Sequence, residues 1–370
     1  MTKARELADQ NKVVSNRNLL KNGEMRIAQR TTSKTGVGTV NGEYPSLDRV
    51  KFFGGNTAAR FTVSQDNDTP EGFSKSLKIA CTTADTSVAA NEYFMMDVCV
   101  EGQNAQGLEF NTSSAKTSTV SFYVKGNAAA RYSCLMSYHI VGGDARAFLQ
   151  TFPVTTDWTR IELTYPGDPI APNSGTYGIL NGTAKGIQLE FWLHGGTNFS
   201  SGTAQETAWF TRDYTEYIGD NTTSIADATS RTFFMTGIQW EISSSATPFE
   251  YKTLSQDLEE CQRYYCELNN LPNGKLRMTG YGGGGTTGGS VFQYPVTMRA
   301  VPTGSFTNGQ TLSANNGAAA SAVSALNATT GSTVASDINV TFGSSYTGKA
   351  LSFYTGSFSA KTSFNFDAEL

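Results

Sequence analysis

The chain has few charged residues and almost no histidine. Only 16% of its 370 residues are Asp, Glu, Lys or Arg, against about a quarter in ordinary soluble domains, and only two are His. Two histidines cannot build a multi-histidine metal centre, and a Ser-His-Asp triad would have to use His139 or His194. The net charge of −4 argues against a nucleic-acid-binding surface, which needs an excess of Lys and Arg.

Long apolar runs are also missing. No stretch approaches the roughly 18 apolar residues of a membrane-spanning helix, and the opening MTKARELADQNK lacks the apolar segment of a signal peptide. The five cysteines are odd in number and contain no CxxC pair, so they indicate neither a zinc ribbon nor a disulfide framework. We therefore expect free, buried thiols, no membrane insertion and assembly in a reducing cytoplasm.

The residues that are abundant favour β structure. The chain has 37 glycines and 11% aromatic residues, which suit turns and half-buried pleated strands. Apolar and polar residues alternate in several runs, which is the period of a strand with one buried face. We therefore predict a mainly β fold whose largest part is a jelly-roll β-sandwich. The alternating runs are 118–125, 131–141, 161–165, 186–194 and 238–242.

Changes in composition divide the chain into four parts. We expect a short N-terminal helical segment at 1–17, the sandwich at 18–250, a connecting helix within 251–270 and a C-terminal β domain at 271–370. The last hundred residues hold only eight charged residues, too few to cover an independent surface. We therefore expect neighbouring subunits to pack against them, with partial disorder as the alternative. The glycine run within 280–289 lacks the Lys-Ser/Thr of a phosphate loop and indicates an exposed loop or tight turn.

Two short apolar stripes are candidate oligomerisation surfaces. The first has the 3-4-3 spacing of a coiled-coil seam with a polar a position, and a frayed amphipathic end is the alternative. The second has 4-3-4-3 spacing along a helix expected at 254–268, where Thr253 and Gln256 fit a capping box. The first stripe consists of Ala4, Leu7, Asn11 and Val14, and the second of Leu254, Leu258, Cys261, Tyr265 and Leu268.

The strand expected at 186–194 carries the candidate carbohydrate-binding residues. Its apolar side chains face one way, which leaves Gln188, Glu190, Trp192 and His194 on the opposite face. An indole stacks on the apolar face of a sugar ring while amide, carboxylate and imidazole groups bond the hydroxyls. Trp209, in the next strand-like run, is a candidate to join this surface. The alternative is a tryptophan covered by a loop or a neighbouring protomer.

The carboxylate pairs Asp213–Glu216 and Asp97–Glu101 have the chemistry of a glycoside-cleaving acid and base. That reaction needs both carboxyl groups in one cleft, and the sequence gives no sign of one. We therefore predict no catalytic residue, no enzyme activity and no cofactor.

A weaker signal lies at the last strand of the sandwich. Trp240 shares an apolar face with its neighbours and is expected in the core. Gln239 and Glu241 lie on the opposite face, and together with Glu24 in the first strand they offer the oxygen ligands of a structural calcium site. This signal is too weak to predict a bound metal.

Several blocks of the sequence resemble bacteriophage tail fibre and virion structural proteins. These have a carbohydrate-binding-module-like jelly roll, then a helix ending in Cys-Gln-Arg-Tyr-Tyr and a small C-terminal β domain. The most specific block is GIQWEI…ATPFEYKTLSQDLEECQRYY, residues 237–265. The others are TKARELAD (2–9), NLLKNGEMRIAQR (18–30), YPSLDRVKF (44–52) and YPVTMRAVPTGSF (294–306).

This resemblance implies a homotrimeric fibre of the virion tail. Its N-terminal segment would attach to phage tail or adaptor proteins, and its β domains would contact a host cell-surface glycan. One alternative is a structural virion protein without a receptor, such as a head fibre, decoration or tail-adaptor protein. A glycan depolymerase is a less favoured alternative. The resemblance identifies no ligand-binding residue.

Overall fold

The computed structural model divides into two compact units, unit 1 up to Asp257 and unit 2 from Leu258 to Leu370, and each is described by itself. No helix among the described residues is long and apolar enough to cross a membrane. The described residues are 16–138, 145–169, 179–204, 206–220, 222–269, 277–282, 286–307, 312–315, 320–342, 350–355 and 363–370.

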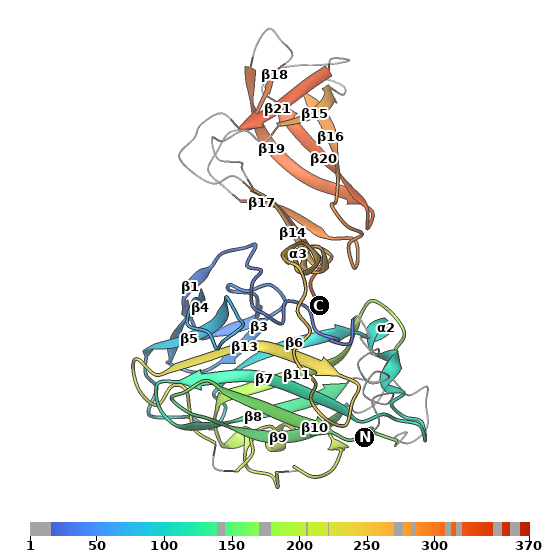
Figure 1. The fold of residues 1–370 in the computed structure, drawn as a ribbon. Helices are drawn as coiled ribbons and strands as arrows, with labels where there is room; N and C mark the ends of the chain where they lie inside the picture. The colour runs from blue at the N-terminus through green and yellow to red at the C-terminus, as the bar shows by residue number, and fades with distance from the viewer. Residues whose placement is uncertain are drawn as a thin grey trace. The chain divides into compact units, whose positions relative to one another are not determined.

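Unit 1 is a jelly-roll sandwich of two antiparallel sheets, as the sequence predicts (Figure 1). The six-stranded sheet has the order β1-β4-β5-β13-β7-β10. Its strands are β1 (Ser33–Val37), β4 (Arg60–Asp66), β5 (Ser76–Thr83), β7 (Ser118–Gly126), β10 (Thr159–Tyr165) and β13 (Thr232–Glu241).

The seven-stranded sheet has the order β12-β9-β8-β11-β6-β3-β2, so β11 lies in its middle. Its strands are β2 (Val40–Glu43), β3 (Lys51–Gly55), β6 (Tyr93–Glu101), β8 (Ala130–Tyr138), β9 (Arg146–Val154), β11 (Lys185–Gly195) and β12 (Phe210–Thr211). Short helical turns connect the strands: α2 (Gly102–Ala105), η1 (Gln106–Leu108), η2 (Thr197–Phe199) and η3 (Tyr214–Glu216).

The main core lies between the two sheets. Phe122 of β7 meets Phe191 of β11 edge-on, with ring centroids 5.3 Å apart, and both contact Phe152 of β9. Trp240 is fully buried in this core, as predicted, and its indole N–H donates to the Ser118 hydroxyl. The five cysteines of the chain are all buried, as expected.

A β-bulge in β13 sets which residues of that strand face the core. Gly237 has φ +63°, and the pairing with β7 shifts register between Thr236 and Gln239. The extra residue changes the parity of the strand, so Met235 and Ile238 both face inward. A side chain at Gly237 would collide with the Phe73 ring.

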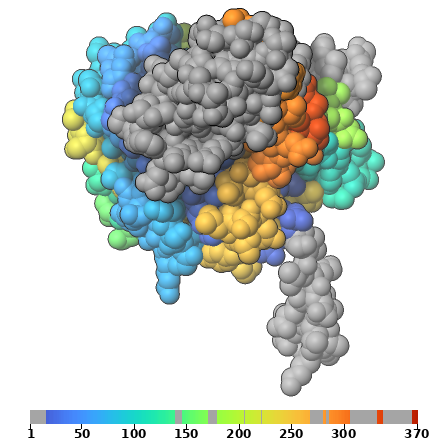
Figure 2. Space-filling model, turned by 90° about the horizontal axis from the view of Figure 1, so that it is seen from above, coloured from blue at the N-terminus to red at the C-terminus, as the bar shows by residue number. Residues whose placement is uncertain are grey.

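The entry segment 18–30 is irregular rather than the expected first strand. Asn22 and Met25 both have positive φ, which lies outside the β region that side-chain-bearing residues of regular strands adopt. The buried Asn22 amide donates to the carbonyl oxygens of Ile27 and Asp48. Two of the blocks that resemble phage proteins are thus hydrogen-bonded to each other. In the space-filling view, the blue and cyan residues, which belong to the N-terminal part of unit 1, lie next to each other on the surface (Figure 2).

The connecting helix α3 (Leu254–Gln262) is shorter than predicted. Its start is as expected, because Thr253 N–H donates to Gln256 Oε1 and Gln256 N–H donates to Thr253 Oγ1. Its end is not, since Tyr265 and Leu268 belong to strand β14 (Tyr265–Asn269), which pairs with β22.

The predicted stripe along this segment is therefore not one helical seam. Leu254 is 57% exposed, Leu258 is half-buried, and Cys261 and Tyr265 are buried. The first stripe, Ala4 to Val14, lies outside the described residues.

Unit 2 is a second β structure, as the sequence predicts. It contains a three-stranded sheet, β14-β22-β17, and a closed barrel, β15-β16-β20-β19-β18-β21. Much of the glycine run lies in strands of the barrel rather than in an exposed loop, since Tyr281 pairs with Gly289 and Gly282 with Gly288. The strands are β15 (Arg277–Gly282), β16 (Thr287–Gln293), β17 (Thr303–Thr307), β18 (Leu312–Asn315), β19 (Ala320–Gly331), β20 (Ala335–Phe342), β21 (Ala350–Thr355) and β22 (Ser363–Asp367).

Candidate functional site

The four candidate residues of β11 lie where the alternation places them. Ile187, Leu189, Phe191 and Leu193 belong to the core between the sheets. Gln188, Glu190, Trp192 and His194 therefore share the outer face of the seven-stranded sheet. Strand β11 pairs with β6 and β8, so these side chains lie on the middle of that face.

Trp192 is covered rather than open. Its side chain is only 4% exposed and belongs to a second apolar cluster with Leu149 and Ile218. The rings of Phe199 and Tyr217, from the segment that follows β11, lie 5.2 and 5.1 Å from its ring. The alternative reading, a tryptophan covered by a loop, is therefore what the structure shows, and Trp192 offers no free face for stacking on a sugar.

Trp209 does not join Trp192. It packs against the core between the sheets, with its ring 5.3 Å from Phe110 and 5.6 Å from Phe148. Its indole N–H donates to the Pro166 carbonyl oxygen. The two tryptophans contact different apolar clusters on opposite sides of the seven-stranded sheet, so the expectation of one shared surface is wrong.

Glu190 is the centre of a buried polar network. Its carboxylate accepts hydrogen bonds from the Ser137 hydroxyl (2.8 Å), the Gln188 amide and the Trp192 indole (3.2 Å). The Arg212 guanidinium lies 2.7 Å from it and forms an ion pair. Gln188 and Glu190 thus have protein partners, and this network fastens the covering segment to the sheet.

Asp97 lies directly across from Glu190 on β6, but no ion pair like that of Glu190 with Arg212 compensates its carboxyl group among the described residues. It is only 2% exposed, and its Oδ1 has no hydrogen-bond partner among the described residues. Burial raises the pKa of Asp97 to about 6, and the nearby Glu190 adds to this effect while Lys185 and Lys51 oppose it. Sequence spacing gave no sign of this pairing across strands.

In each of the two carboxylate pairs considered from the sequence, one carboxylate has a structural hydrogen-bond partner. Asp213 caps the helical turn η3, where it accepts a hydrogen bond from Thr215 N–H. Glu101 accepts a hydrogen bond from the Gln103 amide. None of these carboxylates lines the pocket described next.

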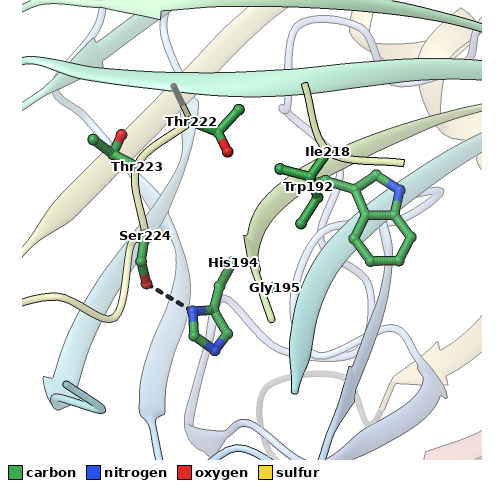
Figure 3. A pocket seen from close by; sticks show the side chains of 7 residues that line it. All are labelled: Trp192, His194, Gly195, Ile218, Thr222, Thr223 and Ser224. Carbon is green, nitrogen blue, oxygen red and sulfur yellow. Dashed lines mark hydrogen bonds between the residues drawn. The ribbon is translucent and has the colours of Figure 1, made fainter. Parts of the chain in front are cut away.

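His194 lies at the end of β11 and forms part of a small surface pocket of about 80 Å³ (Figure 3). Its Nδ1 is 2.7 Å from the Ser224 hydroxyl, and its Nε2 is 3.5 Å from the Glu92 carboxylate. Burial lowers the pKa of His194, against the opposing effect of Glu92, so the imidazole is neutral at neutral pH. The pocket is lined by Trp192, His194, Gly195, Ile218, Thr222, Thr223 and Ser224.

The polar groups of this pocket come mainly from the loop before β13. The Thr222 hydroxyl points toward the pocket and has no protein partner among the described residues (Figure 3). Thr223 is held by Arg131, whose carbonyl oxygen accepts from the Thr223 N–H at 2.8 Å. Sequence reasoning missed this loop, because no pattern in a Ser- and Thr-rich chain separates these three hydroxyls from the others.

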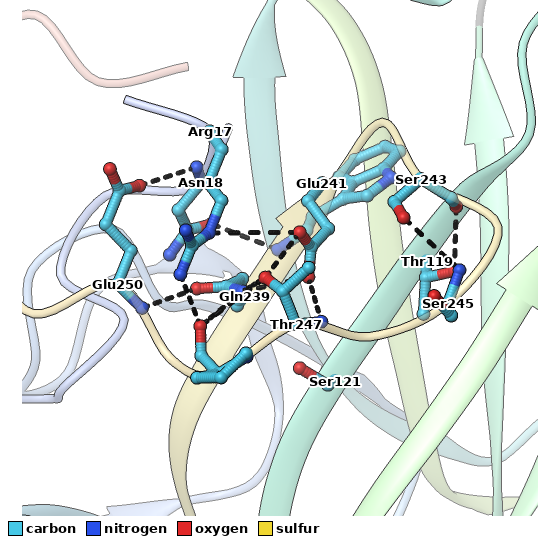
Figure 4. Close-up of polar contacts among 12 residues, drawn as sticks. Arg17, Asn18, Thr119, Ser121, Gln239, Glu241, Ser243, Ser245, Thr247 and Glu250 are labelled. Atoms are coloured by element: carbon cyan, nitrogen blue, oxygen red, sulfur yellow. Dashed lines mark hydrogen bonds and ion pairs between the residues drawn. The ribbon is translucent and has the colours of Figure 1, made fainter. Parts of the chain in front are cut away.

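The three residues considered as calcium ligands have protein partners, and Figure 4 shows those of Gln239 and Glu241. Glu241 accepts hydrogen bonds from the Thr247 backbone N–H, the Thr247 hydroxyl and the Gln239 amide. Glu24 instead pairs with Arg26 at 3.0 Å. Among the described residues no group of three or more His, Cys, Asp or Glu side chains is placed to hold a metal ion.

The Phe249–Glu250 pair of the phage-like block has a structural role. Glu250 accepts hydrogen bonds from the backbone N–H of Asn16 (2.6 Å) and from that of Asn18 (2.8 Å), the second of which is drawn in Figure 4. Phe249 packs edge-on against Phe73 at 5.1 Å. The pair thus fixes the start of the sandwich to the segment that leaves it.

Comparison with known proteins gives likeness of fold and identifies no residue. No family model matches the chain, and no curated protein matches it. A carbohydrate-binding module described as CBM4 is 14% identical with a TM-score of 0.31, over 60% of this chain and 99% of that one. The family 11 carbohydrate-binding module of Clostridium thermocellum, in complex with a β-1,3-1,4-mixed-linked tetrasaccharide, is 12% identical with a TM-score of 0.29, over 58% and 97%.

A phage protein is also similar. The enzymatically active domain of tailspike protein 4 from bacteriophage CBA120 is 10% identical with a TM-score of 0.32. The match covers 61% of this chain but only 22% of the tailspike domain.

Proposed function

We propose that this chain is a bacteriophage virion protein, a homotrimeric tail fibre or receptor-binding protein whose sandwich binds host cell-surface polysaccharide without cleaving it. The polar pocket at the end of β11 carries the binding part of this proposal. It places the hydroxyls of Thr222 and Ser224 beside the neutral imidazole of His194 at the surface of a jelly roll. Of these groups the Thr222 hydroxyl has no protein partner among the described residues, so it can donate to and accept from a sugar hydroxyl.

The size of the pocket fits a weak, repeated contact. Its volume of about 80 Å³ is well below the roughly 300–1,000 Å³ of pockets that enclose a whole small molecule. It therefore takes one substituent of a sugar and leaves the rest of the polymer on the surface. A weak contact of this kind gains strength when several copies bind one polysaccharide together, as in a trimer.

Unit 2 supports the assembly part of the proposal. Its 271–370 region contains only eight charged residues, and among the described residues of this unit four large apolar side chains are more than half exposed. Such side chains favour contact with another subunit. They are Tyr281, Val291, Val301 and Val334. The same feature also favours the second candidate, a structural virion protein without a receptor.

The proposal is tested with the full-length protein on an array of bacterial surface polysaccharides, with its mass measured by light scattering. A trimer that binds at least one polysaccharide and adsorbs to cells carrying it is the expected result. Antibody labelling of intact particles then places the protein on the tail. Labelling of the capsid with no polysaccharide binding favours the structural candidate, and release of reducing ends favours a depolymerase.

A further inference from the structure

The charges behind the pocket at the end of β11 restrict which sugars it accepts. The pocket lining contains no Lys or Arg side chain. Arg131 is hydrogen-bonded to the lining residue Thr223 through its backbone, and its guanidinium lies 3.9 Å from the Glu206 carboxylate. A negatively charged substituent in the pocket would therefore find no cation among these lining groups to compensate it.

Two carboxyl groups lie behind His194 on the side away from Ser224. Glu92 is 5% exposed and its Oε2 is 3.5 Å from His194 Nε2. Asp85 is next to Glu92 and accepts hydrogen bonds from Thr57 Oγ1 and Ala58 N–H. Although burial alone would raise the pKa of Asp85, these hydrogen bonds outweigh burial and hold its pKa below the usual range. Asp85 is therefore ionised, and its negative charge has no cation partner among the described residues.

The hydrogen bonds at His194 fix the direction of its protons. Ser224 Oγ accepts a hydrogen bond from the Ala226 N–H at 2.9 Å, and the Ser224 O–H donates to His194 Nδ1 in the tautomer that carries the imidazole proton on Nε2. The Nε2–H of the neutral imidazole then faces Glu92. His194 thus directs its proton toward the buried carboxyl groups, and it brings no positive charge to the pocket.

From these contacts we propose that the pocket selects neutral sugars, taking a hydroxyl or hydroxymethyl substituent of a hexose and rejecting a carboxylate at the same position. The inference rests on the proposed function and deepens it by naming the class of glycan. The neutral substituent bonds the free Thr222 hydroxyl, whereas a carboxylate is repelled by the ionised Asp85 and finds no cation in the lining.

The test uses polysaccharides that differ only in this substituent. Neutral glucans, mannans and galactans are each immobilised beside the same polymer with its C6 hydroxymethyl groups oxidised to carboxylates, and binding of the full-length protein is measured at pH 7.5. We expect the neutral form to bind about tenfold more tightly, or more. Equal or tighter binding of the oxidised form overturns the inference and leaves the proposed function standing. Binding of no polymer in either form overturns both.

Two variants assign the preference to the buried charges. Asp85→Asn keeps the shape of the side chain and removes its charge, so we expect the preference to fall at least about threefold. Glu92→Gln, which removes the neighbouring carboxyl group, gives a second measurement if Asp85→Asn alters folding, which thermal unfolding reports. Glu71→Gln is the matched control, because Glu71 is exposed and lies outside the pocket. An unchanged preference in both folded pocket variants overturns the assignment to these charges.

Discussion

Asp97 and Glu190 lie directly opposite each other on β6 and β11, yet only Glu190 has a cation bound to it. Arg212, Ser137 and the Trp192 indole surround the Glu190 carboxylate, whereas Asp97 Oδ1 has no partner among the described residues. Because the two buried carboxyl groups share one arginine, the ionised form of Asp97 destabilises the folded protein at neutral pH.

Asp97→Asn should stabilise the protein above pH 6. The pKa of Asp97 is about 6 in the folded chain, against about 3.9 when unfolded, so the folded state holds its proton more tightly. The contribution of Asp97 to stability is complete below about pH 4 and is lost as pH rises through about 6. Urea unfolding at pH 7.5 should show a gain of about 2 kcal/mol for the variant.

The pH dependence separates this effect from a general one. At pH 4 the gain should largely vanish, because the wild-type carboxyl group is then protonated. Asp157→Asn, at an exposed position, is the control and should change little at either pH. An equal gain for Asp97→Asn at both pH values would contradict the assignment.

Arg212→Met should destabilise unit 1. It leaves the buried Glu190 carboxylate without its cation, and breaking one side of a buried pair costs about 3–5 kcal/mol. The double variant Glu190→Gln/Arg212→Met removes the stranded charge and should recover part of that loss. Urea unfolding of Arg212→Met, Glu190→Gln and the double variant measures the coupling, and a loss in the double variant equal to the sum of the two single losses would show that the pair is not coupled.

Gly237→Ala should destabilise the sandwich by about 1–3 kcal/mol. Gly237 has φ +63°, and an added Cβ would lie 2.7 Å from the Phe73 ring, so the β13 bulge would have to shift. Gly182→Ala is a suitable control because an added Cβ there meets no atom within 4 Å. Thermal unfolding of the two variants should give a clear loss for the first only.

Trp192→Ala is a poor probe of sugar binding. Trp192 fills the second apolar cluster, and truncation of a buried aromatic residue costs about 3–5 kcal/mol. We expect this variant to unfold at a lower urea concentration, so a loss of binding would follow from the damaged covering segment. Wild-type stability in Trp192→Ala would contradict its packing role.

Local sequence patterns predict much of the fold but little of the candidate site. The alternation along 186–194 predicts which side chains share a face, and Thr253 with Gln256 predicts where α3 begins. The end of α3 depends on pairing between Tyr265 and Asp367, about a hundred residues apart, which local spacing does not contain. Likewise, nothing within β11 tells that Phe199 and Tyr217 cover Trp192.

The pocket shows the same limit. His194 is visible as one of two histidines, but Ser224 and Thr222 reach it from a loop that follows thirty residues later. The buried carboxyl group of Glu92 lies directly before β6, the strand that pairs with β11. These contacts arise from the sheet order, so residue type and spacing alone do not indicate them.

The most direct test of glycan binding at the pocket compares Thr222→Val with Thr117→Val on a polysaccharide that the wild-type protein binds. Valine keeps the shape of threonine and removes its hydroxyl, and the Thr117 residue lies outside the pocket. Loss of one hydrogen bond of about 1 kcal/mol should weaken binding roughly fivefold for Thr222→Val, with unchanged thermal unfolding, and leave Thr117→Val at the wild-type affinity. Wild-type affinity in a folded Thr222→Val protein would contradict the assignment of the pocket as the glycan-binding site.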